Sequence, residues 1–365
     1  MNPPEEALTL TQATPDTTVT SRRRVLPNSG GRIRLVLAGL GAFLMTFGLL
    51  LRFYAAPRLI AAPAGIYSTV TLADPHASYF DQGTLATRHN VTLTFHETIR
   101  GDAAASTGTI AVWDVFTALE DLKHHVRLNI AFQRSAFNRR TGELTTCCGA
   151  SVNDDTRARQ DGIGAVKWPI GTQKTTYQVY DLNTERAWPA VYSGTAHVQG
   201  LLTYRFTQRI PPTVVQQLPG VPTALLGLPG ASRSVVANRT FQARNTFWVD
   251  PLTGVPVDVE ERILSVLHGP GGQGRLMVAN ADLTMTPASQ RSLAALARQN
   301  AVAITTLRQT APLGGLLLGI LLIVAGTVPF PRLPRQVTRY SIVGTPWRGK
   351  RETPVRSVIS LPNGP

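Results

Sequence analysis

The chain has 365 residues, of which 43% are hydrophobic, and a formal net charge of +14. Much of the positive charge lies at the two ends: residues 1–34 carry five arginines against three acids, and residues 331–365 carry six arginines and one lysine against one glutamate. A nucleic-acid-binding protein would instead gather its basic residues on a folded face. A small disulfide-held scaffold would need many more cysteines than Cys147 and Cys148. We therefore exclude both classes and expect no nucleic-acid partner.

Residues 33–55 are the first predicted transmembrane helix. Leu35 to Leu51 is a run of seventeen residues without a charge, at the short end of what crosses a bilayer. Residues 1–32 are rich in Thr, Pro, Gly, Ser and Arg and predict a disordered cytoplasmic arm. Within this arm, Ser21–Leu26 resembles a twin-arginine export motif. The long apolar core favours an uncleaved anchor, and a cleaved signal is the alternative.

Residues 56–286 predict an extracytoplasmic domain of antiparallel β-structure, so that the fold class is mainly β (α+β). Gln199-Gly200 is expected to turn one long run into a hairpin. The segments Asn138–Gly142 and Asp250–Gly254 also have the composition of hairpin turns. Residues 211–234 contain five prolines and predict a loop, because proline cannot donate to a β-ladder. The predicted β-runs are Tyr67–Leu72, Val91–Ile99, Ile110–Thr117, Val126–Gln133, Thr175–Tyr180, Thr195–Ile210, Thr240–Val249, Val255–Leu267 and Leu276–Met285.

Residues 287–310 predict a juxtamembrane helix, because a set of mostly apolar positions recurs at intervals of three and four. We expect this helix to pack on the β-domain, and a coiled-coil seam is the alternative. Residues 311–329 are the second predicted transmembrane helix, which prolines end. Residues 330–365 are a basic cytoplasmic tail. The recurring positions of the juxtamembrane helix are Leu293, Leu296, Asn300, Ala303 and Leu307.

The basic flanks lie on the outer, terminal side of each apolar segment. By the positive-inside rule, this places both termini in the cytoplasm and the main domain outside, as in a two-pass protein of the cytoplasmic membrane. Gly315 and Gly319 form a G-x-x-x-G step, and Ala38 and Ala42 form a similar step of small residues. Such steps let two membrane helices approach closely. We therefore expect the two helices to pair through these four residues.

The adjacent cysteines Cys147 and Cys148 are the most unusual local feature. Outside the cytoplasm thiols tend to oxidise, and neighbouring cysteines can form a labile ring. We predict a tight turn stabilised by a vicinal disulfide, with redox and metal roles as alternatives. The histidines lack the spacing of a metal site, and nucleotide-binding and hydrolase motifs are absent from the sequence. We therefore predict no catalytic residues, no cofactor and no enzyme activity.

Four stretches carry a family likeness: Leu51–Leu59, Ala111–Thr117, Arg139–Gly149 and Phe247–Gly254. Together they resemble the actinobacterial envelope proteins of the PorA porin family, from about Arg34 to Phe330. The resemblance implies a place in the cell envelope and supplies no catalytic motif. A barrel that spans a membrane needs strands of about ten residues with apolar outward faces, whereas the runs here are short and mixed.

These features predict a non-enzymatic cell-envelope protein whose β-domain binds or passes lipid or lipoglycan precursors next to the bilayer. One alternative is a porin-type channel of the envelope. Another alternative is a scaffold that holds envelope-assembly enzymes as protein partners through the predicted helix of residues 287–309.

Overall fold

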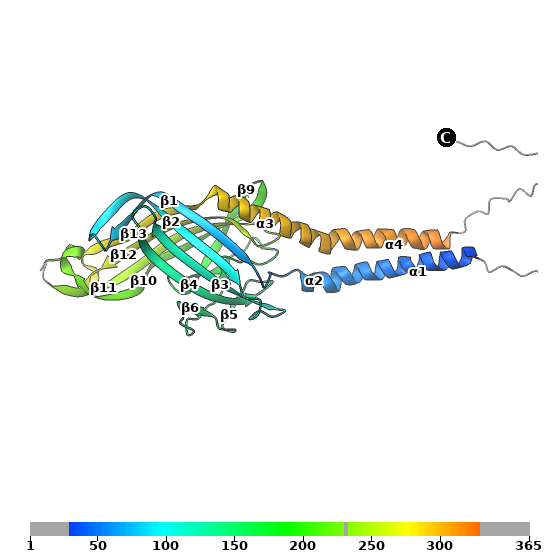
Figure 1. The fold of residues 1–365 in the computed structure, drawn as a ribbon, viewed down its shortest axis with the longest axis horizontal. Coiled ribbons are helices and arrows are strands. Elements are labelled where there is room, and N and C mark those ends of the chain that lie inside the picture. Colours follow the sequence, from blue (N-terminus) through cyan, green and yellow to red (C-terminus); the bar gives the residue numbers. More distant parts are fainter. Residues whose placement is uncertain (1–28, 230–232, 329–365) are drawn as a thin grey trace, which may run out of the picture.

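The computed structural model describes residues 29–229 and 233–328. Figure 1 shows a β-domain from which two long helices leave side by side on one side. The export-like segment Ser21–Leu26 and the tail 330–365 lie outside the described residues. The helices are α1 (Ser29–Leu50), α2 (Ala56–Leu59), α3 (Pro287–Thr305) and α4 (Ala311–Thr327), and π-helical turns at Leu51–Ala55 and Thr306–Thr310 link α1 to α2 and α3 to α4.

In the described part of the chain, thirteen strands form one sheet in the order β5-β4-β3-β2-β1-β13-β12-β11-β10-β9-β8-β7, with β6 paired to β4. All pairings are antiparallel except that of β7 with β8. The prediction of a β-rich domain between two apolar helices is confirmed. The strands are β1 (Tyr67–Asp81), β2 (Ala86–Gly101), β3 (Ile110–Asp121), β4 (Val126–Asn138), β5 (Leu144–Thr145), β6 (Ser151–Val152), β7 (Ile163–Gly164), β8 (Tyr177–Asp181), β9 (Arg186–Val198), β10 (Leu201–Pro222), β11 (Ser234–Val249), β12 (Pro256–His268) and β13 (Arg275–Met285).

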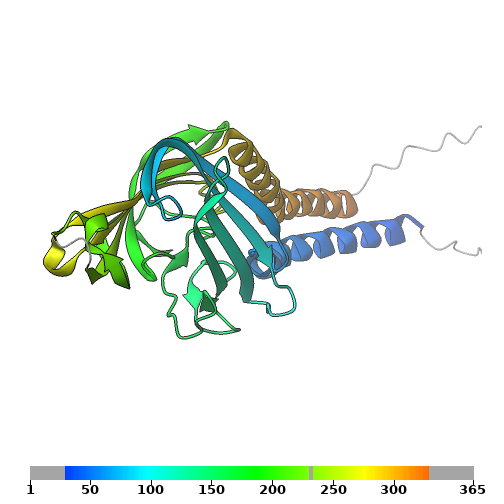
Figure 2. The ribbon, with the colours of Figure 1, turned by 60° about the vertical axis from the view of Figure 1, so that its left-hand side comes forward.

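The sheet curls until its two ends meet, as Figure 2 shows. The Leu144 N–H donates to the Gly162 carbonyl at 2.8 Å, and Glu143 forms a bridge with Ile163. This contact joins the β5 end of the sheet to the β7 end, so the sheet is nearly closed as a barrel. Closure removes the unpaired edges that an open sheet would expose.

The three predicted hairpin turns are confirmed. Gln199 and Gly200 have φ values of +48° and +77° and connect Val198 of β9 to Leu201 of β10, as a two-residue hairpin loop requires. In the other two turns the closing glycine donates to the first residue of the turn: Gly142 to Asn138 and Gly254 to Asp250, both at 2.9 Å.

The predicted loop over residues 211–234 is wrong for most of its length. Strand β10 continues to Pro222 and pairs with β11 up to Ser234. Two features accommodate the prolines. Pairing of β10 with β9 ends at Gln208, so beyond it β11 is the one described neighbour, and the ladder shifts register three times between Ile210 and Val221. Proline fits edge positions and bulges because no ladder hydrogen bond is lost there.

Helices α1 and α4 pack through small residues. A Cβ atom on Gly319 would lie 2.7 Å from the Gly41 carbonyl oxygen, and one on Gly315 would lie 3.3 Å from the Leu44 carbonyl oxygen. Ala38 also belongs to this contact, where it faces Gly326. Of the four predicted packing residues, Gly315, Gly319 and Ala38 thus face the partner helix.

Ala42 needs a correction, because it is exposed. Seven residues of a helix make almost two turns, so the buried positions Gly41 and Gly48 share a face. Ala42 is one residue on from Gly41 and is rotated away from that face.

Helix α3 begins at a Thr286 cap and lies against the mouth of the barrel. Leu293, Ala294 and Ala297 are buried against the strands, and the Arg298 guanidinium donates to the Gln199 carbonyl in the β9–β10 turn. The predicted packing of this helix on the β-domain is therefore confirmed. The helix runs on into α4, so that Pro287–Thr327 is one continuous span of 41 residues.

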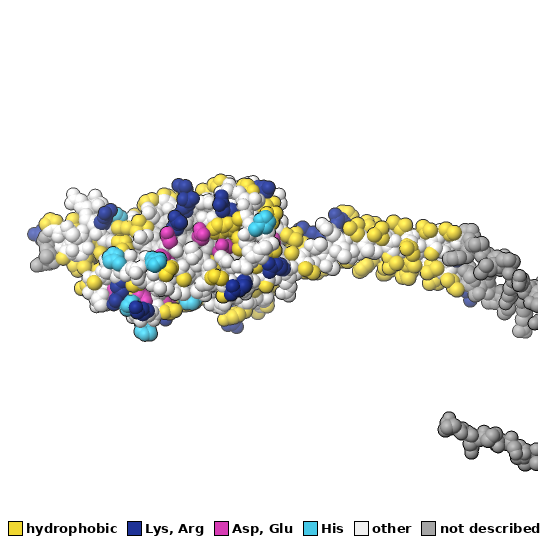
Figure 3. All heavy atoms as spheres, turned by 90° about the horizontal axis from the view of Figure 1, so that it is seen from above, with side chains coloured by type: hydrophobic (Ala, Val, Ile, Leu, Met, Phe, Trp, Pro, Cys, Tyr) yellow, Lys and Arg dark blue, Asp and Glu magenta, His cyan; other side chains and the backbone are white. Residues whose placement is uncertain are grey.

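Two helical spans are long and apolar enough to cross a membrane: Gly31–Leu59 and Pro287–Thr327. Figure 3 shows hydrophobic side chains along the helical part of the molecule, whereas on the visible face of the barrel charged side chains are spread among hydrophobic and other ones.

Candidate functional site in the barrel lumen

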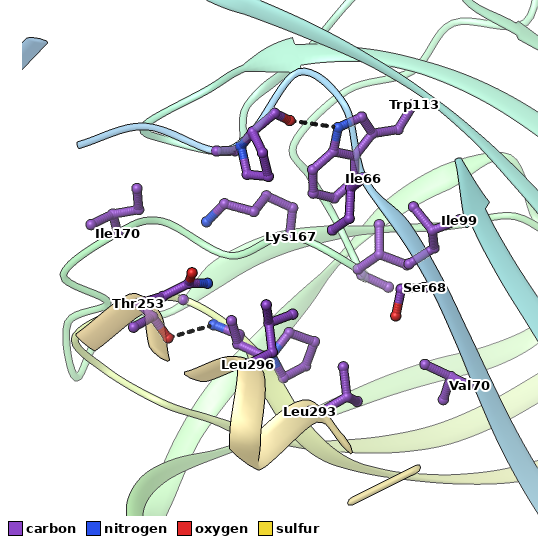
Figure 4. Close-up of a pocket in the computed structure, with 18 of the residues that line it drawn as sticks. Ile66, Ser68, Val70, Ile99, Trp113, Lys167, Ile170, Thr253, Leu293 and Leu296 are labelled. Atoms are coloured by element: carbon purple, nitrogen blue, oxygen red, sulfur yellow. Dashed lines mark hydrogen bonds between the residues drawn. The ribbon is translucent and has the colours of Figure 1, made fainter. Parts of the chain in front are cut away.

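A pocket of about 410 Å³ opens where the helices reach the barrel. We call it the mouth pocket, and Figure 4 shows part of its lining. Helix α3 forms one wall with Leu293 and Leu296, and Ile66, just before β1, forms another together with Val70 of β1. The volume and the mainly apolar lining are typical of pockets that hold small ligands.

The segment between α2 and β1 is tied down at the rim of this pocket. The Trp113 indole N–H on β3 donates to the Pro63 carbonyl at 3.1 Å. The Ala62 N–H donates to the Arg139 carbonyl, and the Arg139 guanidinium donates back to the Ala62 carbonyl, both at 2.7 Å. These hydrogen bonds connect the segment that follows α1 and α2 to the mouth of the barrel.

Lys167 is the one basic side chain in the lining of the mouth pocket. It is only 8% exposed, and its ammonium donates to the Trp168 carbonyl. Figure 4 shows the side chain in the pocket with its amine end towards Ile170. Burial lowers the pKa of Lys167 to about 7, because an apolar surrounding disfavours the charged form.

Two hairpin turns hold the backbone around Lys167. A Cβ atom on Gly142 would lie 2.6 Å from the Lys167 carbonyl oxygen, and one on Gly254 would lie 2.5 Å from the Pro169 carbonyl oxygen. The Trp168 N–H donates to the Gly254 carbonyl at 3.2 Å. Both glycines have positive φ values, which favour glycine. The two predicted turns Asn138–Gly142 and Asp250–Gly254, which both end in Thr-Gly, therefore pack against the same segment around Lys167 and hold it in place.

A narrower space of about 100 Å³ follows inside the barrel, and we call it the neck. Glu97 on β2 and Glu261 on β12 line both the neck and the mouth pocket. Burial raises the pKa of Glu97 to about 7. Burial and then the nearby charge of Glu97 raise the pKa of Glu261 to about 8. Within the described residues, neither carboxyl has a hydrogen-bond or ion-pair partner, so the neck carries two unpaired acidic groups.

Amide and hydroxyl groups complete the neck. The Gln208 amide donates to the Val179 carbonyl at 2.7 Å and accepts from the Asn245 amide at 2.9 Å. Asn245 Oδ1 and Tyr180 Oη are buried and lack a hydrogen-bond partner within the described part of the chain. Buried polar atoms are usually satisfied, so the neck has unused capacity for polar contacts.

A third space of about 380 Å³, the far chamber, lies near the β1–β2 and β3–β4 turns. Asn129, Asn183 and Glu261 line both the neck and the far chamber. The three spaces therefore adjoin one another and form a lumen along the barrel, apolar at the mouth and polar at the neck.

The outer wall of the barrel carries exposed charged side chains, with exposed apolar ones such as Phe116 and Ile130 among them. Arg244, Arg262 and Asp282 alternate along their strands with inward residues and are exposed. A barrel that spans a bilayer needs an apolar outer band. Here the continuous apolar surface covers the helices instead (Figure 3).

The two predicted cysteines lie away from the lumen. Cys147 and Cys148 are bonded to each other in the turn between β5 and β6, and Cys147 packs near Ala150 on the outside of β4. They line none of the three lumen spaces, so their role remains a prediction. Within the described residues, no group of three or more His, Cys, Asp or Glu side chains could hold a metal ion.

The sequence reasoning missed Lys167, Glu97 and Glu261. A signal existed for the glutamates, because each stands in a β-run at a position of the same parity as inward apolar residues: Glu97 between Phe95 and Ile99, and Glu261 between Val259 and Ile263. Nothing in the loop around Lys167 indicates burial, because its surroundings come from distant turns.

The family model described as Porin PorA matches residues 33–328, from the first turns of α1 to the end of α4. No curated protein matches the chain. The match includes both apolar helices and every strand, so the helices and the barrel all lie within the part of the chain that the family model matches.

Proposed function

The chain belongs to the Porin PorA family, and on that premise we propose that it is a non-enzymatic conduit of the cell envelope that stands on two membrane anchors. In this proposal the barrel lies outside the bilayer, and its lumen takes up amphiphilic molecules, such as lipid or lipoglycan precursors, from the membrane. Family membership and the barrel support a channel-type envelope protein. The nature of the cargo is our proposal.

The position of the mouth pocket carries the proposal. Its walls include Leu59 and Ile60 at the end of α2, Ile304 near the end of α3, and Leu307 in the π-helical turn that leads into α4. Both segments continue directly into the apolar spans. A lipid chain that leaves the bilayer beside the anchors therefore meets an apolar surface at once. Each CH₂ group buried there contributes about 0.8 kcal/mol.

The proposed topology places both termini in the cytoplasm and the barrel outside. It is supported by the arrangement in Figure 1, where the start of α1 and the end of α4 lie at the same end of the helix pair. A reporter domain that works only in the cytoplasm should be active when it is fused to either terminus. A reporter that works only outside the cytoplasm should be inactive at both. An N-terminal fusion that is active outside would contradict the uncleaved anchor.

Lipid retention tests the function. The full chain, purified in detergent, should carry bound lipid that mass spectrometry detects. Ala303→Trp places a bulky ring at the lining of the mouth pocket and should reduce bound lipid several-fold. Val302→Trp is the matched control, because Val302 is the next residue, is exposed and is not part of that lining.

A channel for polar solutes is the second candidate, and the polar lining of the neck favours it. Ion conductance of the pure protein in planar bilayers would support this candidate. The close contact of Gly41 with Gly319 leaves no passage between the helices of one copy, so such a channel would need several copies. Equal lipid retention by the wild type and Ala303→Trp, together with conductance, would favour the channel over the lipid conduit.

A further inference from the structure

Lys167 brings a positive charge into an apolar pocket that lies next to the membrane anchors. We propose that the Lys167 ammonium binds the carboxylate of a single-chain amphiphile, a fatty acid, whose hydrocarbon chain lies in the mouth pocket. This inference rests on the proposed function, and it names the class of molecule that the mouth pocket takes.

The ammonium has donor capacity that the protein does not use. It offers three N–H donors, and the hydrogen bond from Lys167 in the described part of the chain goes to the Trp168 carbonyl. No ion pair among the described residues includes Lys167. The two remaining donors match the two oxygens of one carboxylate.

An unpaired buried charge is unfavourable, and a bound anion removes that penalty. Burying a charge is costly unless it is paired and hydrogen-bonded. Glu97 and Glu261 are the acidic side chains in the lining of the mouth pocket, and neither forms an ion pair with Lys167. A neutral or cationic amphiphile would leave the ammonium without a counter-ion, whereas a fatty acid supplies one.

The backbone holds Lys167 where the ligand needs it. Gly142 and Gly254 clamp the segment so closely that their Cβ atoms would collide with its carbonyl oxygens. Figure 4 shows Ile66 near the base of the Lys167 side chain and Ile170 beyond its amine end, while Leu296 and Val70 line other parts of the same pocket. One basic group in a mainly apolar pocket of about 410 Å³ fits one hydrocarbon chain with one anionic end.

Binding of a fluorescent fatty acid tests the proposal. The full chain in detergent is titrated with cis-parinaric acid and, separately, with its uncharged methyl ester. A hydrogen bond to a charged group contributes about 1.5–3 kcal/mol, so the wild type should bind the acid about ten- to hundredfold more tightly than the ester. Lys167→Met should bind both probes with the affinity of the ester, whereas Lys167→Arg should keep part of the preference for the acid.

Lys174→Met is the matched control, because Lys174 is exposed and lies over the rings of Tyr192 and Tyr204. It should keep the full preference. Displacement of bound probe from the unmodified protein, strong with oleate and weak with oleyl alcohol, tests the same point without any substitution.

The outcomes separate the inference from the function. Equal affinity of the wild type for acid and ester, or a preference that survives in Lys167→Met, would overturn the role of Lys167 while leaving the conduit intact. Failure of Ala303→Trp to weaken either probe would instead show that the mouth pocket is not the binding site, and would overturn both.

Discussion

The helix pair and the barrel wall differ in the surface that they present to their surroundings. The helices expose leucine, isoleucine and phenylalanine along their length, with Leu35 and Leu317 78% and 69% exposed. The barrel exposes arginine, glutamate and aspartate between its inward residues (Figure 3). Since lipid tolerates few exposed charges, the two surfaces fit two environments. In this porin-family chain, the helices and not the barrel have the surface of a membrane-spanning element.

Breaking the helix pair should have the largest effect. Gly319→Leu would place its side chain against the backbone of Gly41, and such overpacking typically costs about 1–3 kcal/mol and occasionally more. Cross-linking between cysteines introduced at Leu44 and Leu316 should fall strongly. Gly314→Leu is the control, because a Cβ atom on Gly314 meets nothing within 4 Å. Unchanged cross-linking in Gly319→Leu would mean that the glycine contact does not hold the pair together.

Substitution of a glycine that packs against the Lys167 segment should destabilise the protein nearly as much. Gly254→Ala adds a Cβ atom 2.5 Å from the Pro169 carbonyl oxygen at a φ of +69°, and we expect a loss of about 2–4 kcal/mol in unfolding free energy. Gly171→Ala has a similar φ of +80° but meets nothing within 4 Å, so it isolates the conformational term. Chemical denaturation measures both variants. If they lose the same amount, the collision with the Lys167 segment does not matter.

Two glutamates on the inner face of the wall should make the stability of the protein depend on pH. Folding raises the pKa of Glu97 from 4.5 to about 7 and that of Glu261 from 4.5 to about 8. The folded state therefore keeps protons that the unfolded chain has already released. The stabilisation from these two groups is greatest below pH 4.5 and is lost as the pH rises from 4.5 to about 8.

Glu261→Gln should flatten this decline and stabilise the protein at pH 8 by about 1–3 kcal/mol. Glu260→Gln, the neighbouring residue on the outer face, should leave the curve of melting temperature against pH unchanged. Lys167 makes the stability of the folded state increase with pH above pH 7, because folding lowers the pKa of this lysine to about 7. It is present in both variants, so it does not affect the comparison. Equal effects of the two substitutions would contradict the inward position of Glu261.

Charges on the outer wall should matter least. The Arg262 and Asp282 side chains are 3.8 Å apart and both 63% exposed, and exposed ion pairs contribute about 0–1 kcal/mol. Arg262→Gln should change the melting temperature by no more than a degree or two at physiological salt. A large shift would indicate that this face of the barrel is covered in the intact protein.

The predictable parts of this fold are those that depend on local pattern. Apolar runs without charge identify α1 and α4, and alternating runs identify most long strands. Gln199-Gly200 suffices for its hairpin, because the positive φ values of a two-residue loop are a property of those residues. The prolines of β10 mislead, because their tolerance depends on β9 ending its pairing at Gln208. The extent of a neighbouring strand is not encoded beside the prolines.

The candidate site is less predictable, because closure of the barrel creates it. Neighbouring residues of a strand face opposite sides, which separates Glu260 from Glu261, but only the closed sheet shows which side is the lumen. Lys167 is buried by turns that are 25 and 87 residues away at Gly142 and Gly254. The small-residue step on α1 likewise failed at Ala42, since the helix presents Gly41 and Gly48 to its partner.

The continuous helix from α3 to α4 connects a wall of the mouth pocket directly to an apolar span. Pro287–Thr327 is one helix of 41 residues, and α3 forms a wall of the mouth pocket while α4 lies in the apolar span. Membrane helices tilt to match bilayer thickness, and in the proposed topology a tilt of α4 would also move α3, which is joined to it by the π-helical turn at Thr306–Thr310. In the proposed topology, we therefore expect the width of the lumen entrance to change with the thickness of the lipid layer around the two apolar helices.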